Sequence, residues 1–206
     1  PNIGKEGQGD MRIHNDAGLE NALHLKSDTH AQLHVQSEAL GRDLRVIVLD
    51  GSVLCAVERT APQVTGDGRQ SIAALIERHP GIVAADGRID ATLAGQGFAR
   101  GSIPATGTRI ALLPVTNLSS GGTADIVTDR LGPELVEIAR AATAALGLRY
   151  AGVDMIVPDG QWKGADATVL EVNAAPGLNN LYRQGPHEAN CVKSVYAALF
   201  QKLFEN

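Results

Sequence analysis

The strongest constraint on the fold lies in residues 44–57. Two dense apolar runs, at 44–49 and 52–57, are separated by the pair Asp50-Gly51. An Asp-Gly pair between such runs is a strong short-range signal for a β-hairpin, because both residues of the tight turn need a positive φ. The sequence therefore predicts two antiparallel strands here, with Arg59 just beyond the second one.

The remaining apolar patterns alternate between the periods of strands and helices. Alternating apolar residues predict further strands over residues 10–14 and 32–36, and apolar segments predict strands over 109–115, 150–157 and 167–172. A helical spacing predicts helices over residues 17–26, 71–79, 133–146 and 188–204. Residues 81–107 are the least periodic part and are expected only to form a helix-containing insertion. A chain of 206 residues with this mixture is expected to fold as one two-lobed α+β unit.

Composition and charge exclude several classes of function. A formal net charge of −5 gives no general attraction to nucleic-acid phosphates or anionic lipid, and three Phe, three Tyr and one Trp provide few platforms for stacking bases. No apolar stretch approaches the length of a membrane span, and the polar start of the chain does not resemble a signal peptide. Cys55 and Cys191 each lie in an apolar run, which favours buried thiols in a reducing compartment over a disulfide. We therefore expect a cytoplasmic protein without nucleic-acid or membrane partners.

Oxygen-bearing side chains interrupt two of the predicted strands. Asp154 lies in an otherwise apolar run at 152–156, and Glu171 and Asn173 lie in another at 169–173. Since strand side chains alternate between faces, Glu171 and Asn173 point the same way, and Asp154 on a neighbouring strand can join them. Three oxygen ligands on a rigid sheet suit Mg²⁺, which takes its remaining ligands from water and phosphate. The alternative is that these groups simply face solvent at strand ends.

Three other clusters are weaker candidates. Residues 4–9, Gly-Lys-Glu-Gly-Gln-Gly, form a glycine-rich loop that can wrap phosphates, or only a flexible terminus. Arg42, Arg45 and Arg59 on the hairpin suit phosphate or carboxylate groups, or a solvated strand edge. Residues 117–123, Asn-Leu-Ser-Ser-Gly-Gly-Thr, are a run of small donors that can bind an anion through backbone N–H groups, or an ordinary turn.

In chain order, these segments resemble the later two thirds of an ATP-grasp domain, the fold in which two α+β lobes hold ATP between them and join a carboxylate to an amine. The resemblance rests on GKEGQG at 4–9, GRDLRVIVLDGSVLCAVER at 41–59, GDG at 66–68, NLSSGGTA at 117–124, AGVDMIV at 151–157 and LEVNAAPGL at 170–178. Motifs in this order are specific to the family. The chain is most similar to cyanophycin synthetases, the ATP-grasp half of bifunctional glutathione synthetases, N-acetylglutaminylglutamine synthetases and ribosomal-protein glutamate ligases, and the sequence does not choose among them.

The resemblance implies an organisation and a set of site residues. Residues 1–40 would be part of the lid lobe, and residues 41–206 would be the C-terminal lobe with an antiparallel sheet and the metal site. Magnesium, or manganese in its place, would be held by Asp154, Glu171 and Asn173. ATP would be bound by Lys5, Gly7, Gly9, Gln36, Ser37, Leu40 and Asp43, the last at the ribose hydroxyls. Arg45 and Arg59 would act in catalysis at the phosphate and acyl-phosphate region. The acceptor substrate would lie at Asn117, Ser119, Gly121, Gly122 and Gly177.

The activity that the resemblance implies is a ligase reaction. A substrate carboxylate would attack the γ-phosphate of ATP to give an acyl phosphate and ADP, and an amine of an amino acid or peptide would then form the amide. Phosphoryl transfer needs mainly positioning and charge neutralisation, which metal ions, lysine and arginine supply. The alternative from another class is a nucleotide-binding or scaffolding module without turnover.

Three features depart from the family pattern. Ser37 stands where the family hinge has an acid, Ile126 stands where the following loop commonly has Asp, and the chain begins at Pro1 without the family's preceding lobe and phosphate-binding lysine. We therefore expect a fragment of a longer enzyme that has further domains, with a homo-oligomer left open. If this is the whole molecule, it is expected to bind nucleotide poorly and to lack turnover.

Overall fold

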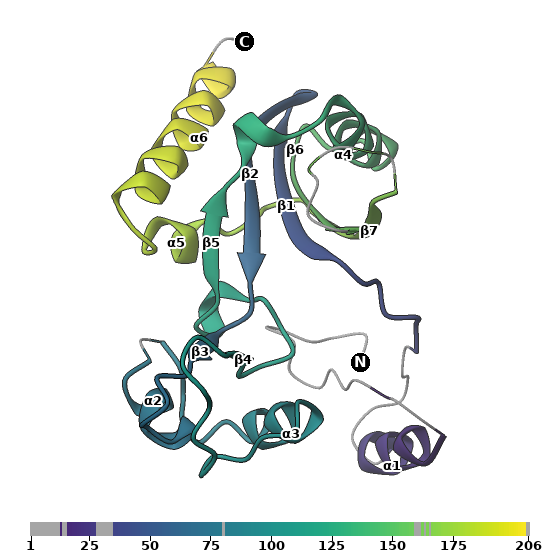
Figure 1. Ribbon diagram of the computed structural model, residues 1–206. Coiled ribbons are helices and arrows are strands. Elements are labelled where there is room, and N and C mark those ends of the chain that lie inside the picture. Colours follow the sequence, from purple (N-terminus) through teal and green to yellow (C-terminus); the bar gives the residue numbers. More distant parts are fainter. Residues whose placement is uncertain are drawn as a thin grey trace.

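The computed structural model describes residues 13, 16–27, 35–79, 81–158, 162, 164 and 166–204. Its centre is a five-stranded antiparallel sheet in the order β5-β2-β1-β6-β7, and a two-stranded sheet of β3 and β4 lies beyond one end of it (Figure 1). In chain order the elements are α1 (Asp16–Ser27), β1 (Arg42–Leu49), β2 (Ser52–Thr60), β3 (Gln63–Thr65), α2 (Ile72–Glu77), α3 (Arg88–Gly95), β4 (Arg109–Ala111), η1 (Leu118–Ser120), β5 (Thr123–Ile126), η2 (Thr128–Arg130), α4 (Pro133–Ala145), β6 (Tyr150–Val157), β7 (Thr168–Asn173), α5 (Asn179–Tyr182) and α6 (Pro186–Phe204).

Strands β1 and β2 form the predicted hairpin. Asp50 and Gly51 have φ values of 46° and 74°, as the tight turn requires. The carboxylate of Asp50 accepts hydrogen bonds at 2.7 and 2.8 Å from the guanidinium of Arg149, the residue just before β6. The turn thus holds one end of β1 against both of its neighbouring strands, β2 and β6.

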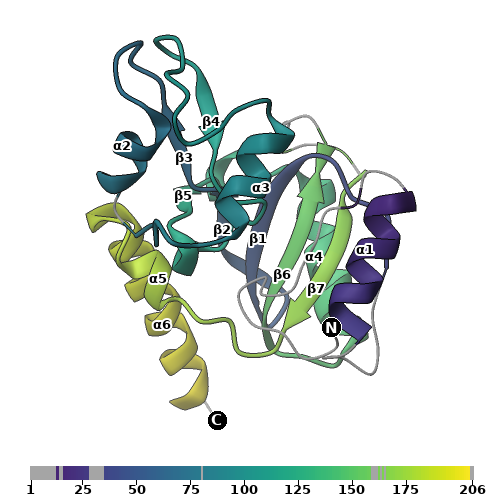
Figure 2. The same cartoon turned by 90° about the horizontal axis from the view of Figure 1, so that it is seen from below.

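Helices cover both faces of the five-stranded sheet, with α4 on one side and α5 and α6 on the other (Figures 1 and 2). Because strand side chains alternate, Val46 packs toward α4, and its neighbour Ile47 packs toward α5 and α6. The core under α4 contains Leu44, Val46, Val48, Ala56, Val127, Leu135, Ala139, Val153, Met155, Val157 and Trp162. The core under α5 and α6 contains Ile47, Cys55, Val57, Leu178, Leu181, Val192 and Val195.

A buried carboxylate on the α4 side pairs with an exposed arginine. Glu58 is buried and forms an ion pair with Arg42. The Arg42 guanidinium lies over the ring of Trp162, 4.8 Å from its centroid, where the negative face of the indole stabilises the cation. Arg42 thus lies on the opposite sheet face from Arg45 and Arg59, although the sequence grouped the three together.

The two long predicted helices of the C-terminal half are confirmed. Helix α4 has Pro133 at its first position, where the missing N–H is not needed, and Gly147, with φ 64°, follows its end. Helix α6 begins at Pro186, two residues earlier than predicted, and runs to Phe204. Among the described residues, no helix combines the length and apolar character needed to span a membrane.

Residues 63–113 build a third core, separate from the five-stranded sheet, around β3, β4, α2 and α3, which we call the smaller core. Its members are Val64, Ile72, Ile76, Ile89, Leu93, Ile110, Leu112 and Leu113. The predicted helix after Ser71 is confirmed, and the Ser71 hydroxyl accepts a hydrogen bond from the Ala74 amide as an N-cap. Helix α3 lies in the stretch with no clear period, so the expected helix-containing insertion is also confirmed.

One predicted strand is shorter than expected, two lie largely outside the described residues, and two short strands were missed. The strand predicted at 109–115 ends at Ala111, and Pro114 further on cannot donate to a sheet. Val35 and Gln36 have no regular structure, and the rest of the strand predicted at 32–36 lies outside the described residues, as does most of 10–14. Strands β3 and β5, of 3 and 4 residues, were missed because so few residues show no period.

Candidate functional site

The oxygen-bearing side chains predicted from the strand patterns lie together on one sheet face. Asp154 on β6 pairs with Glu171 on β7, and Asn173 lies two residues further along the same strand. On its other side, Asp154 pairs with Arg45 on β1. Residues directly opposite each other on neighbouring strands share a face, so the side chains of Arg45, Asp154 and Glu171 form one row across three strands.

Asp154 is the most enclosed member of this row. Its carboxylate accepts two hydrogen bonds from the Arg45 guanidinium, each of 2.6 Å, and Arg59 Nη2 lies 3.3 Å from Asp154 Oδ2. Only 4% of the Asp154 side chain is exposed. Burial alone would raise the pKa of Asp154, but the hydrogen bond from Arg45 and the charges of Arg59 and Arg45 outweigh it and hold that pKa below its usual value. Asp154 is therefore an ionised carboxylate between two cations.

Arg59 connects Asp154 to the carboxylate of Asp43, whose side chain is 11% exposed. Arg59 Nε and Nη2 lie 2.7 and 2.6 Å from Asp43 Oδ1, and the Thr116 hydroxyl donates to Asp43 Oδ2. Both oxygens of Asp43, the predicted ribose acceptor, are thus engaged by protein donors. Thr116, which the sequence did not single out, joins the network because the chain returns from the smaller core at that point.

Glu171 and Asn173 form the open side of the site. The Glu171 side chain is 60% exposed, and its Oε1 lies 4.0 Å from Arg45 Nη2. The Asn173 amide donates to the same oxygen at 2.9 Å, which leaves its own carbonyl oxygen as an acceptor. No group of three or more His, Cys, Asp or Glu side chains suited to a metal occurs among the described residues. A cation here would therefore need the Asn173 oxygen beside the two carboxylates.

The predicted hinge residues lie just before β1. Gln36 and Ser37 are exposed in an irregular segment, and 77% of Leu40 is exposed. Gly41 then brings the chain against the Val157 carbonyl, where an added Cβ would lie 2.4 Å from the oxygen. The phosphate-loop candidates Lys5, Gly7 and Gly9 lie outside the described residues.

The candidate anion-binding run at 117–123 forms a closed turn. The amides of Ser120 and Gly122 both donate to the Asn117 carbonyl, and the Gly121 amide donates to that of Leu118. Those three N–H groups are therefore used inside the turn, as in the alternative reading of an ordinary turn. The exposed Ser119 lies within the short η1 helix of this turn.

The two glycines of this turn are needed for close backbone packing. A Cβ on Gly122 would lie 2.8 to 3.0 Å from the carbonyl oxygens of Thr116, Thr60 and Asn117, and Gly121, with φ 90°, lies against Gly81 of the smaller core. The turn thus joins the smaller core to the edge of the five-stranded sheet.

Gly177 lies on the connection from β7 to α5. It is exposed, and an added Cβ would meet nothing within 4 Å. The preceding Pro176 packs over Gly152, where a Cβ would approach the proline ring to 2.8 Å. This connection therefore leads from the Asn173 end of the site to the helices that cover the same sheet face.

Comparison with known proteins gives a consistent result. Residues 115–191 match the family described as RimK-like ATP-grasp domain. The whole chain is 33% identical to 24% of the cyanophycin synthetase of Trichormus variabilis, and 92% of it is 28% identical to 28% of the bifunctional glutathione biosynthesis protein of Streptococcus agalactiae. The bifunctional glutathione synthetase of Pasteurella multocida superposes on 79% of the chain with a TM-score of 0.58 and 25% identity, over 25% of its own length.

The chain belongs to the ATP-grasp family. The family assignment and the ATP-grasp fold expected from the sequence motifs are thus confirmed. The matched segment, 115–191, contains β6 and β7 with Asp154, Glu171 and Asn173. Arg45 and Arg59 lie before it, on the hairpin. The chain spans about a quarter of the length of these ATP-grasp relatives.

Proposed function

We propose that the protein carrying this chain is an ATP-dependent ligase that joins a substrate carboxylate to the amine of an amino acid or peptide through an acyl phosphate. The observation that carries this proposal is the cluster in which Arg45, Arg59, Asp154 and Glu171 meet on one sheet face, with Asn173 beside them. Fixed charges of both signs suit phosphoryl transfer, which needs positioning and charge neutralisation and no protein nucleophile. The similarity to cyanophycin synthetase and to glutathione biosynthesis proteins supports the same reaction class.

The donor set fits Mg²⁺, or Mn²⁺ in its place. Asp154 and Glu171 provide carboxylate oxygens and Asn173 an amide oxygen, all hard ligands. Their positions in register on two paired strands support a shared cation site. When bound, the metal ion would neutralise charge on the phosphates of ATP.

The arginines would serve the transferred phosphoryl group. Arg45 and Arg59 lie among three carboxylates. Burial would lower the pKa of Arg45, but its hydrogen bond to Asp154 and the charges of these carboxylates together outweigh burial and raise this pKa. The Arg45 guanidinium would therefore enter the reaction charged, and both arginines could donate to phosphate oxygens. Asp43 orients Arg59 by accepting a hydrogen bond from its guanidinium. A ribose contact by Asp43 would use the lone pairs that remain after Arg59 and Thr116 have donated.

The remaining assignments extend the proposal along the chain. Residues 1–40 would belong to the lid lobe, and residues 41–206 would form the C-terminal lobe with the metal site. Nucleotide contacts are assigned to Lys5, Gly7, Gly9, Gln36, Ser37 and Leu40. The acceptor side is assigned to Asn117, Ser119, Gly121, Gly122 and Gly177, with contacts through side chains and carbonyls where the amides are used in the turn.

The setting of the proposed reaction is a longer cytoplasmic enzyme. The relatives are about four times as long as this chain, which supports further domains beside this one. Two free cysteines and the lack of a spanning helix among the described residues are compatible with the cytoplasm. A homo-oligomer is left open.

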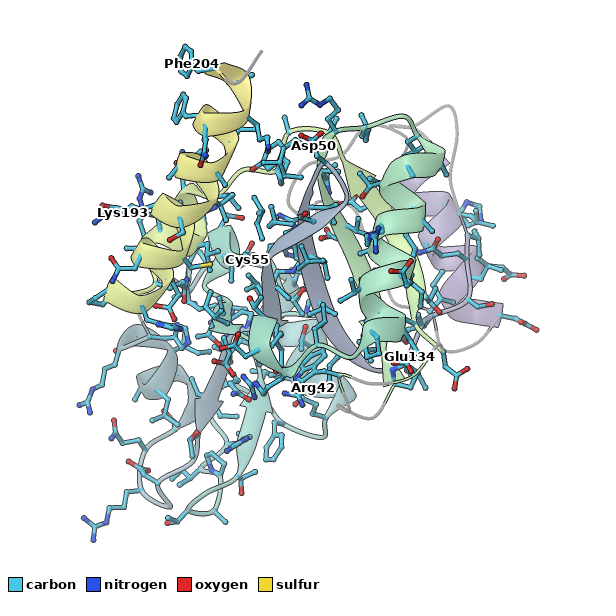
Figure 3. The ribbon with its side chains drawn as sticks, turned by 90° about the horizontal axis from the view of Figure 1, so that it is seen from above. Arg42, Asp50, Cys55, Glu134, Lys193 and Phe204 are labelled. Carbon is cyan, nitrogen blue, oxygen red and sulfur yellow. The ribbon has the colours of Figure 1, made fainter. Side chains whose placement is uncertain are left out.

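The test is ADP release by the protein that carries this chain, measured across a panel of amino acids and short acidic peptides. We expect one carboxylate and one amine to stimulate ADP release in the presence of Mg²⁺. The variant Glu171→Ala removes an exposed ligand from the site and should abolish the stimulation. Glu134→Ala, on the exposed side of α4 across the sheet (Figure 3), is the matched control and should retain it.

Two outcomes would count against the ligase. ADP release that survives Glu171→Ala would contradict the metal assignment. If the protein binds ADP in a Mg²⁺-dependent way but releases no ADP from ATP with any substrate of the panel, the alternative is favoured, a nucleotide-binding or scaffolding module without turnover.

A further inference from the structure

The two cysteines of the chain meet in the core under α6. Cys55 lies on β2 and Cys191 on α6, 136 residues apart in sequence, and their sulfur atoms are 2.6 Å apart. Both are free thiols in this structure. Figure 3 shows Cys55 on the side of the sheet that faces α6. The sequence predicted separate buried thiols and gave no reason to bring them together.

The environment of the two thiols is unequal. Cys55 is fully buried, whereas Cys191 is partly exposed. The hydrogen bond between them lowers the pKa of Cys191, against burial and the nearby Glu188, and the same hydrogen bond together with burial raises the pKa of Cys55. Cys191 is therefore the thiol that loses its proton first and that a reagent from solution can reach.

We propose that Cys55 and Cys191 form a reversible disulfide that links α6 to strand β2. A disulfide requires an S–S distance of about 2.05 Å, so the sulfur atoms need to approach by only about 0.5 Å from their present 2.6 Å. This modification site is separate from the Asp154 cluster and does not depend on the proposed ligase activity.

The chemistry is thiol–disulfide exchange with a small disulfide, such as oxidised glutathione, as oxidant. The Cys191 thiolate attacks one sulfur of the oxidant and forms a mixed disulfide, releasing one thiolate. The Cys55 thiol then loses its proton and attacks Cys191 Sγ, which forms the protein disulfide and releases the second thiolate. Two protein thiols are oxidised and one disulfide is reduced to two thiols, so that electrons and protons balance.

The structural consequence is a covalent tie between the sheet and its outer helix. Helix α6 packs on this face through Val192 and Val195, which follow Cys191 in the chain. The link would close a loop of more than a hundred residues, and restricting the unfolded chain in this way stabilises the folded one.

The experiment compares the chain before and after incubation with oxidised glutathione under native conditions. Free thiols are counted with a maleimide after denaturation, and the intact mass and melting temperature are measured. We expect both thiols to disappear together, a mass decrease of about 2 Da, and a rise in Tm of about 5–15 °C. Dithiothreitol should reverse all three.

Two serine variants test the order of the steps. Cys55→Ser should retain one glutathione on Cys191, because no second thiol resolves it. Cys191→Ser should leave the buried Cys55 unreacted under native conditions. Disulfide-linked dimers, a lasting glutathione adduct on the unsubstituted chain, or two thiols that stay free would each overturn the proposal. A Cys191→Ser variant that reacts as fast as the unsubstituted chain would overturn the assignment of Cys191 as the attacking thiol.

Discussion

Replacing Asp154 with Asn should destabilise the fold far more than replacing an exposed aspartate. The substitution removes one negative charge that faces Arg45 at 2.6 Å and Arg59 at 3.3 Å. The exposed fractions are 4% for the Asp154 side chain and 9% for that of Arg59, so solvent cannot replace the lost charge. Removing one partner of a buried ion pair typically destabilises a protein by about 3–5 kcal/mol. Because the Asn oxygen can still accept one hydrogen bond, we expect about 3 kcal/mol, or a fall in Tm of about 6–12 °C for a chain of this length.

The matched control is the pair of Asp125 and Arg130, which has the same chemistry at the surface. The Asp125 side chain is 64% exposed and that of Arg130 is 52% exposed. Exposed pairs contribute little to stability, so Asp125→Asn should change Tm by less than about 2 °C. Both variants are followed by thermal and urea unfolding with circular dichroism. Equal shifts in the two variants would refute the reasoning that burial of the Asp154 pair decides the magnitude.

Three further predictions concern the same network and its support. Because the pKa of Asp154 is lowered in the folded state, its stabilisation is complete above the unfolded-state pKa of about 3.9 and is lost as pH falls through the folded-state pKa. The difference in unfolding free energy between the unsubstituted chain and Asp154→Asn, measured by urea titrations between about pH 3 and 7, should therefore shrink below about pH 4. A constant difference would argue against an ionised Asp154. Thr116→Val removes the hydroxyl that donates to Asp43, so urea unfolding should show a loss of about 1 kcal/mol in the free energy of unfolding. An unchanged midpoint would mean that Asp43 does not need this donor. Gly122→Ala places a Cβ within 3.0 Å of three backbone oxygens and should lower the free energy of unfolding by about 1–3 kcal/mol. The control Gly95→Ala, in α3 with nothing within 4 Å of the new Cβ, should be neutral or stabilising. Equal effects of the two variants would show that the turn adjusts freely.

The grouping of the candidate metal ligands could be predicted from sequence because it depends on local geometry. Glu171 and Asn173 are two residues apart on one strand, and the period of a strand places such residues on one face. Asp154 required one more inference, that the strand at 150–157 would pair with the strand that follows it. Consecutive strands pair often, and here they do.

The Asp43–Arg59 pair could not be predicted, because it depends on an irregularity in the hairpin. Next to the turn, Leu49 faces Ser52, and counting outward from there places Asp43 opposite Glu58, a like charge. The register shifts by one residue between Ile47 and Val48, and Arg59 is opposite Asp43 instead. Such a shift depends on the twist and packing of the whole sheet, and no short sequence pattern indicates it.

The contacts between distant segments could not be predicted from the sequence either. Cys55 and Cys191 are brought together only because α6 packs on β2. Similarly, Gly121 lies against Gly81 of the smaller core, a contact that no local pattern indicates. Each case needs the tertiary structure, since neither partner carries a local signal for the other.

The most direct test of the proposed site is calorimetric titration of ADP into the protein that carries this chain, with Mg²⁺ and with excess EDTA. Glu171→Gln is the decisive variant, because its side chain is 60% exposed and its loss should leave the fold intact, and Glu134→Gln is the matched control. The account predicts Mg²⁺-dependent binding that weakens at least about tenfold in Glu171→Gln and stays unchanged in Glu134→Gln. Equal ADP affinity with Mg²⁺ and with EDTA, or equal affinity in the two variants, would contradict it.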